Sequence, residues 1–135
     1  MTRRADWEAR LHDYIASLAE AEFRWGKLDC ALFAAGAVQA MTGADPAARY
    51  RGHYTTARGS VRALRKWGAG TLPATIDALF EPIGPAFARR GDLVMVGDAV
   101  GVCFGADALF IGEQNGAAGL VRFGRALWSK AWRVD

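Results

Sequence analysis

The apolar segment Cys30–Met41 constrains the fold of this chain more than any other feature of the sequence. It contains almost no polar residue, and it lies between Asp29, which is suited to cap a helix, and Gly43, which is suited to end one. A helix that is apolar on nearly all sides is buried in a folded protein. We therefore expect the rest of the chain to wrap around this helix. Its small residues would let other elements approach closely, namely Ala34, Ala35, Gly36 and Ala37.

Further helical patterns lie on both sides of this segment. Residues 7–18 place apolar side chains on one helical face, and Thr2 is the expected N-cap of that helix. A short helical turn is expected at 45–48, a helix capped by Thr55 carries Val61 and Leu64, and another short helix runs from Thr71 to residue 80.

After Pro85 the pattern changes to short apolar runs, which predict strands at 93–96, 100–104, 108–111, 119–123 and 132–134. Turn signals separate them at 97–98, 105–107 and 114–116, and one helical turn is expected at 127–131. The spacing suggests an antiparallel meander. Helices followed by strands predict an α+β fold, in which N-terminal helices pack on a small C-terminal antiparallel sheet as a single domain, 1–135.

The composition excludes several classes of site. Two Cys and two His are too few for a disulfide framework, or for a zinc site without carboxylate ligands, so neither a metal nor another cofactor is expected. A histidine base in any hydrolase mechanism must be His12 or His53. We expect neither a signal peptide nor a membrane span, because acidic residues interrupt the basic start and no long apolar run follows.

Cys30 is the most informative position for chemistry. It stands in the first turn of the buried helix, where the helix dipole and unsatisfied N–H groups favour a thiolate and lower the pKa of the thiol. The alternative interpretation is that Cys30 is a small buried apolar side chain.

Four separated motifs resemble a phage and prophage family catalogued as the domain of unknown function DUF6950. They are Trp25-Gly-x-x-Asp29-Cys30, Thr42-Gly-x-Asp45-Pro-Ala47, Tyr50-Arg-Gly-x-Tyr54 and Ala131-Trp-Arg-Val134. That family occurs among tail genes and in gene-transfer-agent-like clusters. The resemblance implies a tail-associated structural or assembly protein with partners at the tail tip or hub. It would be located in the virion, or in the bacterial host cytoplasm before assembly.

A wider resemblance is to the NlpC/P60 group of papain-like cysteine hydrolases. It rests on Asp29-Cys30 opening a helix, on Arg90-Gly-Asp-Leu-Val94 and on Val100-Gly-Val102. The resemblance implies that Cys30 is the nucleophile and that Trp25 and Asp29 line the cleft. It places Ala99 where the group has its catalytic histidine, and apolar residues 108–111 where it has a polar orienting residue. Without a base the triad cannot operate, so we expect an inactive relative.

The alternative is an active cysteine peptidase or amidase acting on peptidoglycan, with Cys30 as nucleophile. In that case His53, from the loop 49–54, would have to serve as the base, because a loop can reach an active site. His12, on the polar flank of the first helix, is less suited to this role.

A basic stripe is expected on the helix after Thr55, where Arg58, Arg62 and Arg65 recur at i, i+4 and i+7, opposite Val61 and Leu64. A nucleic-acid partner is disfavoured, because the net charge is only +3 and no recognised nucleic-acid motif is present. An acidic protein partner explains the stripe at least as well.

Overall fold

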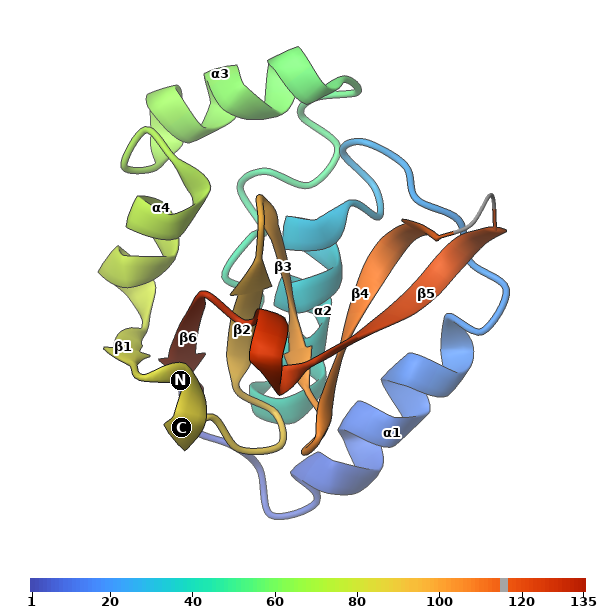
Figure 1. Cartoon of the computed structure of the whole chain (residues 1–135). Coiled ribbons are helices and arrows are strands. Elements are labelled where there is room, and N and C mark those ends of the chain that lie inside the picture. Colours follow the sequence, from blue (N-terminus) through green and yellow to red (C-terminus); the bar gives the residue numbers. More distant parts are fainter. Residues whose placement is uncertain (115–116) are drawn as a thin grey trace.

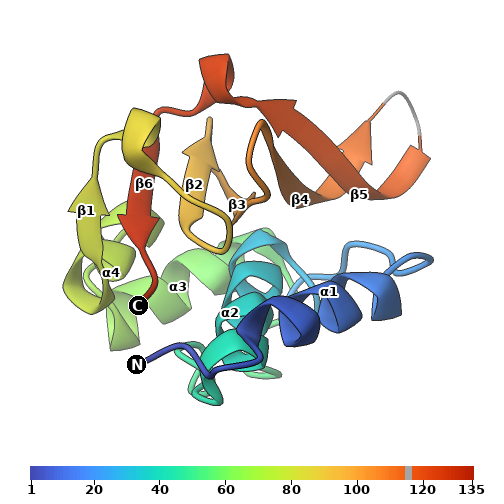
Figure 2. The same ribbon diagram turned by 90° about the horizontal axis from the view of Figure 1, so that it is seen from below.

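Helix α2 (Cys30–Thr42) lies at the centre of the computed structural model, which describes the backbone of residues 1–114 and 117–135. Its side chains Phe33, Val38 and Met41 are buried completely. The sheet covers one side of α2, and α1 (Trp7–Ser17) packs along another (Figures 1 and 2). At Gly36 a β-carbon would collide with the Tyr14 ring of α1, so this glycine is what allows the close approach. The predicted buried helix is therefore confirmed.

The other elements complete an α+β fold, as predicted. The described residues contain two further α-helices, α3 (Ala57–Trp67) and α4 (Leu72–Leu79), and two short 3-10 helices, 85–87 and 125–127. The strands are β1 (Glu81–Ile83), β2 (Leu93–Val96), β3 (Ala99–Cys103), β4 (Asp107–Gln114), β5 (Ala117–Gly124) and β6 (Lys130–Arg133). They form one antiparallel sheet in the order β1-β6-β2-β3-β4-β5.

The sheet has an apolar core on each face. Val100 and Val102 of β3 pack with α2 in the main core, whereas Cys103 and Ala99 belong to a second cluster on the opposite face. Trp128 helps to cover that second face, and Arg125 lies over its ring. Because alternate side chains of a strand point to opposite faces, neighbouring residues of β3 serve different cores.

The structure corrects several predicted helical boundaries. Helix α1 begins at Trp7 with Asp6 as its N-cap, so Thr2 is not the cap; the backbone N–H of Arg4 is bonded instead to Met41 of α2. Residues 45–48 belong to a turn region and do not form the predicted turn of helix. The cap of α3 is Thr56, whose hydroxyl accepts the N–H of Gly59. The single helical turn near the C-terminus is a 3-10 helix at 125–127, earlier than predicted.

The sheet also differs from a simple meander. Strands β2 to β5 follow one another as predicted, but β6 inserts between β2 and β1. Strand β1 contains Pro82 and was not predicted; as an edge strand it tolerates a residue that cannot donate to the ladder. The predicted turn signals at 97–98 and 105–107 do separate strands. The third predicted turn, 114–116, contains residues 115–116, which lie outside the described residues.

A buried carboxylate joins the two ends of the chain. Asp92, which is 1% exposed, accepts bonds from Nη2 of Arg3 at 2.9 Å and from the backbone N–H of Val134 at 3.0 Å. Its second oxygen accepts the N–H of Arg89 at 2.9 Å. These donors compensate for the loss of water around the charge. Asp92 thereby fastens the N-terminal and C-terminal segments to the turn that leads into β2.

We predict that Asp92→Ala lowers the free energy of unfolding by about 3–5 kcal/mol, because it leaves a partly buried guanidinium and two N–H groups without their acceptor. Urea denaturation measures the change. Asp13→Ala is the matched control, since Asp13 is an exposed residue of α1, and it should leave the urea midpoint nearly unchanged. Equal effects of the two substitutions would contradict the assigned role.

Candidate functional site

A cavity of about 560 Å³ lies between α2, the pair α3–α4 and the β2–β3 hairpin. Figure 1 shows α3 and α4 on the side of the molecule away from α1. Most of the side chains that line the cavity are apolar, among them Val61, Leu64, Leu79, Phe80, Met95 and Val100. Cys30, at the start of α2, also lines it. The cavity therefore combines an apolar lining with a thiol, and we treat it as the candidate site.

Asp29 determines where Cys30 lies. One carboxylate oxygen accepts the N–H of Leu32 and caps α2, and the other accepts the N–H of Gly26 and the hydroxyl of Tyr54. Gly26 has φ +78°, and a β-carbon there would collide with the carbonyl oxygen of Tyr54. The motif Trp25-Gly-x-x-Asp29-Cys30 is thus explained by the turn and cap that hold the start of α2.

The loop that follows α2 is tied to the same helical turn. Arg51 forms a salt bridge to Asp45 at 2.9 Å, and its Nη2 donates to the carbonyl oxygen of Leu32 at 3.2 Å. Tyr50 and Tyr54 of this loop line the cavity, and Tyr50 packs edge-on against Trp67 of α3. The loop therefore forms part of the cavity wall and supports α3.

Helix α4 is held from the sheet side. The indole N–H of Trp132, a fully buried residue of β6, donates to Asp77 of α4 at 2.8 Å. The hydroxyl of Thr75, in α4, accepts the N–H of Ala69 in the turn between α3 and α4. These contacts keep the outer wall of the cavity in place.

The surroundings of the Cys30 thiol favour its neutral form. Burial raises its pKa above the ordinary value, and the negative charge of Asp29 acts in the same direction. The backbone N–H groups of Val100, Ala31 and Cys30 itself favour the thiolate, but they do not outweigh burial. The lowered pKa expected from the helix N-terminus is therefore not found, because neighbouring elements remove water from the sulfur.

The predicted cleft residues fall in two places. Trp25 and Asp29 line the cavity together with Cys30. Ala99 instead packs against the second core, whereas its neighbours Asp98 and Val100 line the cavity. The position that the hydrolase resemblance assigns to a histidine thus belongs to the face of the sheet away from Cys30.

Neither histidine is among the described residues that line the cavity. The Nδ1 of His53 lies 2.6 Å from the carbonyl oxygen of Arg49, and because a carbonyl only accepts, Nδ1 carries the proton. The ring packs against Trp67 with 5.6 Å between centroids. His12 is exposed on α1. The structure therefore does not bring either predicted base to Cys30.

Sequence reasoning missed two polar side chains of the site. The first is Asp98, which the turn 97–98 and the alternation with Val100 could have placed on the cavity face. The second is Tyr54, whose bond to Asp29 joins two of the recognised motifs. Cys30 and Cys103 are both free thiols, and Cys103 lies in the second core.

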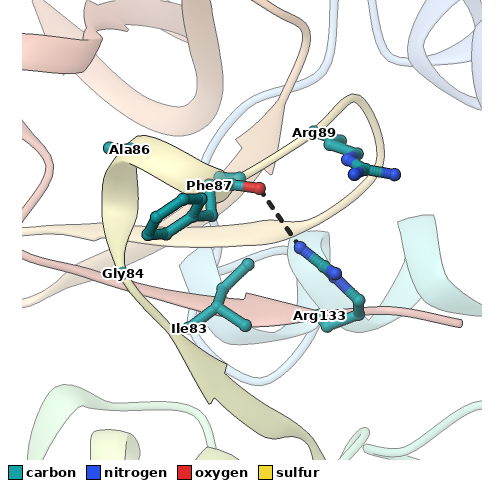
Figure 3. A pocket seen from close by; sticks show the side chains of 7 residues that line it. Ile83, Gly84, Ala86, Phe87, Arg89 and Arg133 are labelled. Atoms are coloured by element: carbon teal, nitrogen blue, oxygen red, sulfur yellow. Dashed lines mark hydrogen bonds between the residues drawn. The ribbon is translucent and has the colours of Figure 1, made fainter.

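A second pocket, of about 430 Å³, lies beside the 3-10 helix 85–87 (Figure 3). Arg133 lines it and donates to the carbonyl oxygen of Phe87 at 3.2 Å, while its Nε lies 3.8 Å from Asp92. None of the predicted site residues lines this pocket, and Arg133 is already engaged in holding the fold.

The part of the chain that the structure describes lacks two other kinds of feature. No helix there has the length and apolar character needed to cross a membrane. No group of three or more His, Cys, Asp or Glu is arranged to hold a metal ion.

The sequence model of one protein family, described as "Domain of unknown function (DUF6950)", matches residues 2–134 of the chain. The match covers nearly the whole chain, including all four motifs that carried the resemblance to this family. A search of curated proteins found no match.

We predict that Tyr54→Phe lowers the free energy of unfolding by about 2 kcal/mol, because it removes a hydrogen bond to the buried carboxylate of Asp29. Thermal and urea denaturation measure the effect. Tyr50→Phe is the matched control, because burial and the charge of Arg49, and no hydrogen bond within the described residues, act on the Tyr50 hydroxyl; it should change the free energy by less than about 0.5 kcal/mol. A Tyr54→Phe variant as stable as the control would contradict the role given to Asp29.

Proposed function

The chain belongs to the DUF6950 family, and from this premise we propose that it is a tail-associated structural or assembly protein of a phage or prophage. In this proposal its cleft resembles that of NlpC/P60 cysteine hydrolases but does not catalyse hydrolysis. The tail role comes from the resemblance, which relates the motifs of this chain to a family found among tail genes. The absence of catalysis is argued from the residues around Cys30.

The observation that carries the proposal is a cysteine without a base. Within the described residues, the carboxylates that line the cavity are Asp29 and Asp98, and no imidazole lines it. Asp29 is already occupied by three donors. An ordinary carboxylate is roughly four pH units less basic than a thiolate, so it is a poor acceptor for a thiol proton. Cys30 therefore lacks the group that would convert it into a nucleophile at neutral pH.

The lining of the cavity supports a role in binding. Trp25, Val61 and Leu79 are each more than a third exposed, and all three line it. Apolar side chains that remain accessible around one cavity are typical of a surface that another molecule covers. A tail component that contacts a neighbouring protein through this cleft needs such a surface and needs no catalytic base.

We predict that Cys30 reacts with iodoacetamide as an unactivated thiol. Burial favours the protonated form, so the rate should rise only as the pH passes the ordinary thiol range of ~8.5, with no plateau near neutral pH. Peptide mapping by mass spectrometry follows Cys30 and Cys103 separately, and the buried Cys103 is the internal control. A fast rate near pH 6 that His53→Ala or Asp98→Asn abolishes would support the active peptidoglycan hydrolase instead.

We also predict that the chain is present in purified particles. Mass spectrometry of particles from a strain that carries the gene should detect it with the known tail proteins, and deletion of the gene should impair tail assembly. Replacement of the gene by a Cys30→Ser allele should restore normal particles, since the proposed role does not use the thiol. Absence of the chain from particles with no assembly defect on deletion would overturn the tail role.

A further inference from the structure

The basic stripe borders the cavity. Arg65 lines the cavity beside Val61 and Leu64, and Arg58 and Arg62 follow on the same exposed side of α3. The sequence placed the stripe opposite the apolar residues, whereas the structure places it along one edge of the cleft. A ligand that lies over α3 would therefore meet an apolar cavity and a row of cations together.

The stripe is not neutralised by the protein itself. Helix α3 contains no acidic residue, and within the described residues none of its three arginines forms a salt bridge. The exposed apolar side chains Val61 and Leu79 lie on the walls of the same cleft. A ligand that complements this surface carries negative charges as well as apolar groups.

A protein segment fits this surface better than a nucleic acid does. Bases bind to proteins by stacking on free aromatic faces. Trp67, the aromatic residue of α3, is already packed by Tyr50 and His53, and the cations of Arg49 and Lys66 lie near its ring. The cavity beside the stripe is lined mainly by apolar side chains, which give no favourable environment to phosphates.

We propose that the cleft binds an extended segment of a partner protein in which acidic and apolar residues alternate. This inference rests on the proposed function, since it names the chemistry of the partner that the non-catalytic cleft would hold. The apolar side chains enter the cavity over Cys30, and the carboxylates face Arg58, Arg62 and Arg65. Successive arginines are about one helical turn apart, ~5.4 Å, and alternate residues of an extended chain are ~6.6 Å apart, so the two rows match approximately.

Asp98 determines on which side of the cleft the carboxylates of the bound segment lie. It lines the cavity from the β2–β3 hairpin, whereas Arg65 lines it from α3. The negative charge of Asp98 repels carboxylates from the sheet side of the cleft and leaves the α3 side for them. An apolar segment without charges, or one with basic residues, would form no ion pairs with the arginines of the stripe.

Cys30 provides a reporter for the test with the full-length chain. The probe is the peptide Asp-Leu-Glu-Phe-Asp-Leu-Glu-Phe, and the matched peptide has Lys in place of every acidic residue. Fluorescence anisotropy of labelled peptide measures binding. Alkylation of Cys30 at alkaline pH, followed by peptide mapping, reports whether the bound peptide covers the cavity, and Cys103 again serves as the internal reference.

We expect the acidic peptide to bind and to slow the alkylation of Cys30, with affinity that falls as salt is added. Arg58→Glu combined with Arg62→Glu should weaken binding by about tenfold, because two attractive surface contacts become repulsive. Arg122→Glu, an exposed substitution on β5, should leave the affinity unchanged. Val61→Glu should also weaken binding, whereas Leu127→Glu, at an exposed residue outside the cleft, should not.

Three results would overturn the inference: equal binding of the basic peptide, binding without protection of Cys30, or displacement of the peptide by duplex DNA at a lower concentration than by unlabelled peptide. These outcomes are distinguishable from failure of the proposed function. Absence from particles removes the tail role but leaves peptide binding measurable, and an activated Cys30 would refute the non-catalytic cleft whether or not the peptide binds.

Discussion

The rest of the structure depends on how the buried helix α2 begins. A helix enclosed on nearly all sides cannot leave its first N–H groups to water, and Asp29 supplies the acceptor. The carboxylate is itself 1% exposed, so it needs donors of its own, and these come from the turn before it and the loop after it. One buried charge therefore fixes the Gly26 turn, the position of Tyr54 and, one residue later, the thiol of Cys30.

The motifs on which the two resemblances rest are largely explained by the fold. Asp29 and Asp92 are both buried carboxylates, and each gathers donors from segments that are far apart in the sequence. Trp132 of the C-terminal motif fixes α4 through Asp77. These residues therefore have structural roles that hold the helices and the sheet together, and none of their contacts moves a proton to or from Cys30.

Local patterns in the sequence were sufficient for the α+β class, the buried helix and the four-strand meander, because helix caps and periodicity determine these elements. They were not sufficient for β1, where Pro82 argues against a strand and only the pairing with β6 creates one. Thr2 has the chemistry of a cap, but contacts of Arg3 with Asp92 and Val134 hold that segment outside the helix. For the site, Trp25 and Asp29 line the cavity together with Cys30, whereas the surroundings of Cys30, His53 and Ala99 depend on tertiary packing that local patterns do not determine.

The thiol shows how distant packing reverses a local expectation. A helix N-terminus stabilises a nearby anion by roughly 0.3–1 kcal/mol at exposed positions, and up to ~2 kcal/mol when partly buried. Removing an ion from water costs several kcal/mol unless a partner of opposite charge compensates. At Cys30 the negative charge of Asp29 raises the pKa of the thiol further, so burial and charge together favour the neutral form. A neutral sulfur is an apolar surface, which suits the binding of apolar side chains. The same burial that raises the pKa of Cys30 therefore makes its sulfur part of the largely apolar lining of the cavity, beside Arg65 of α3.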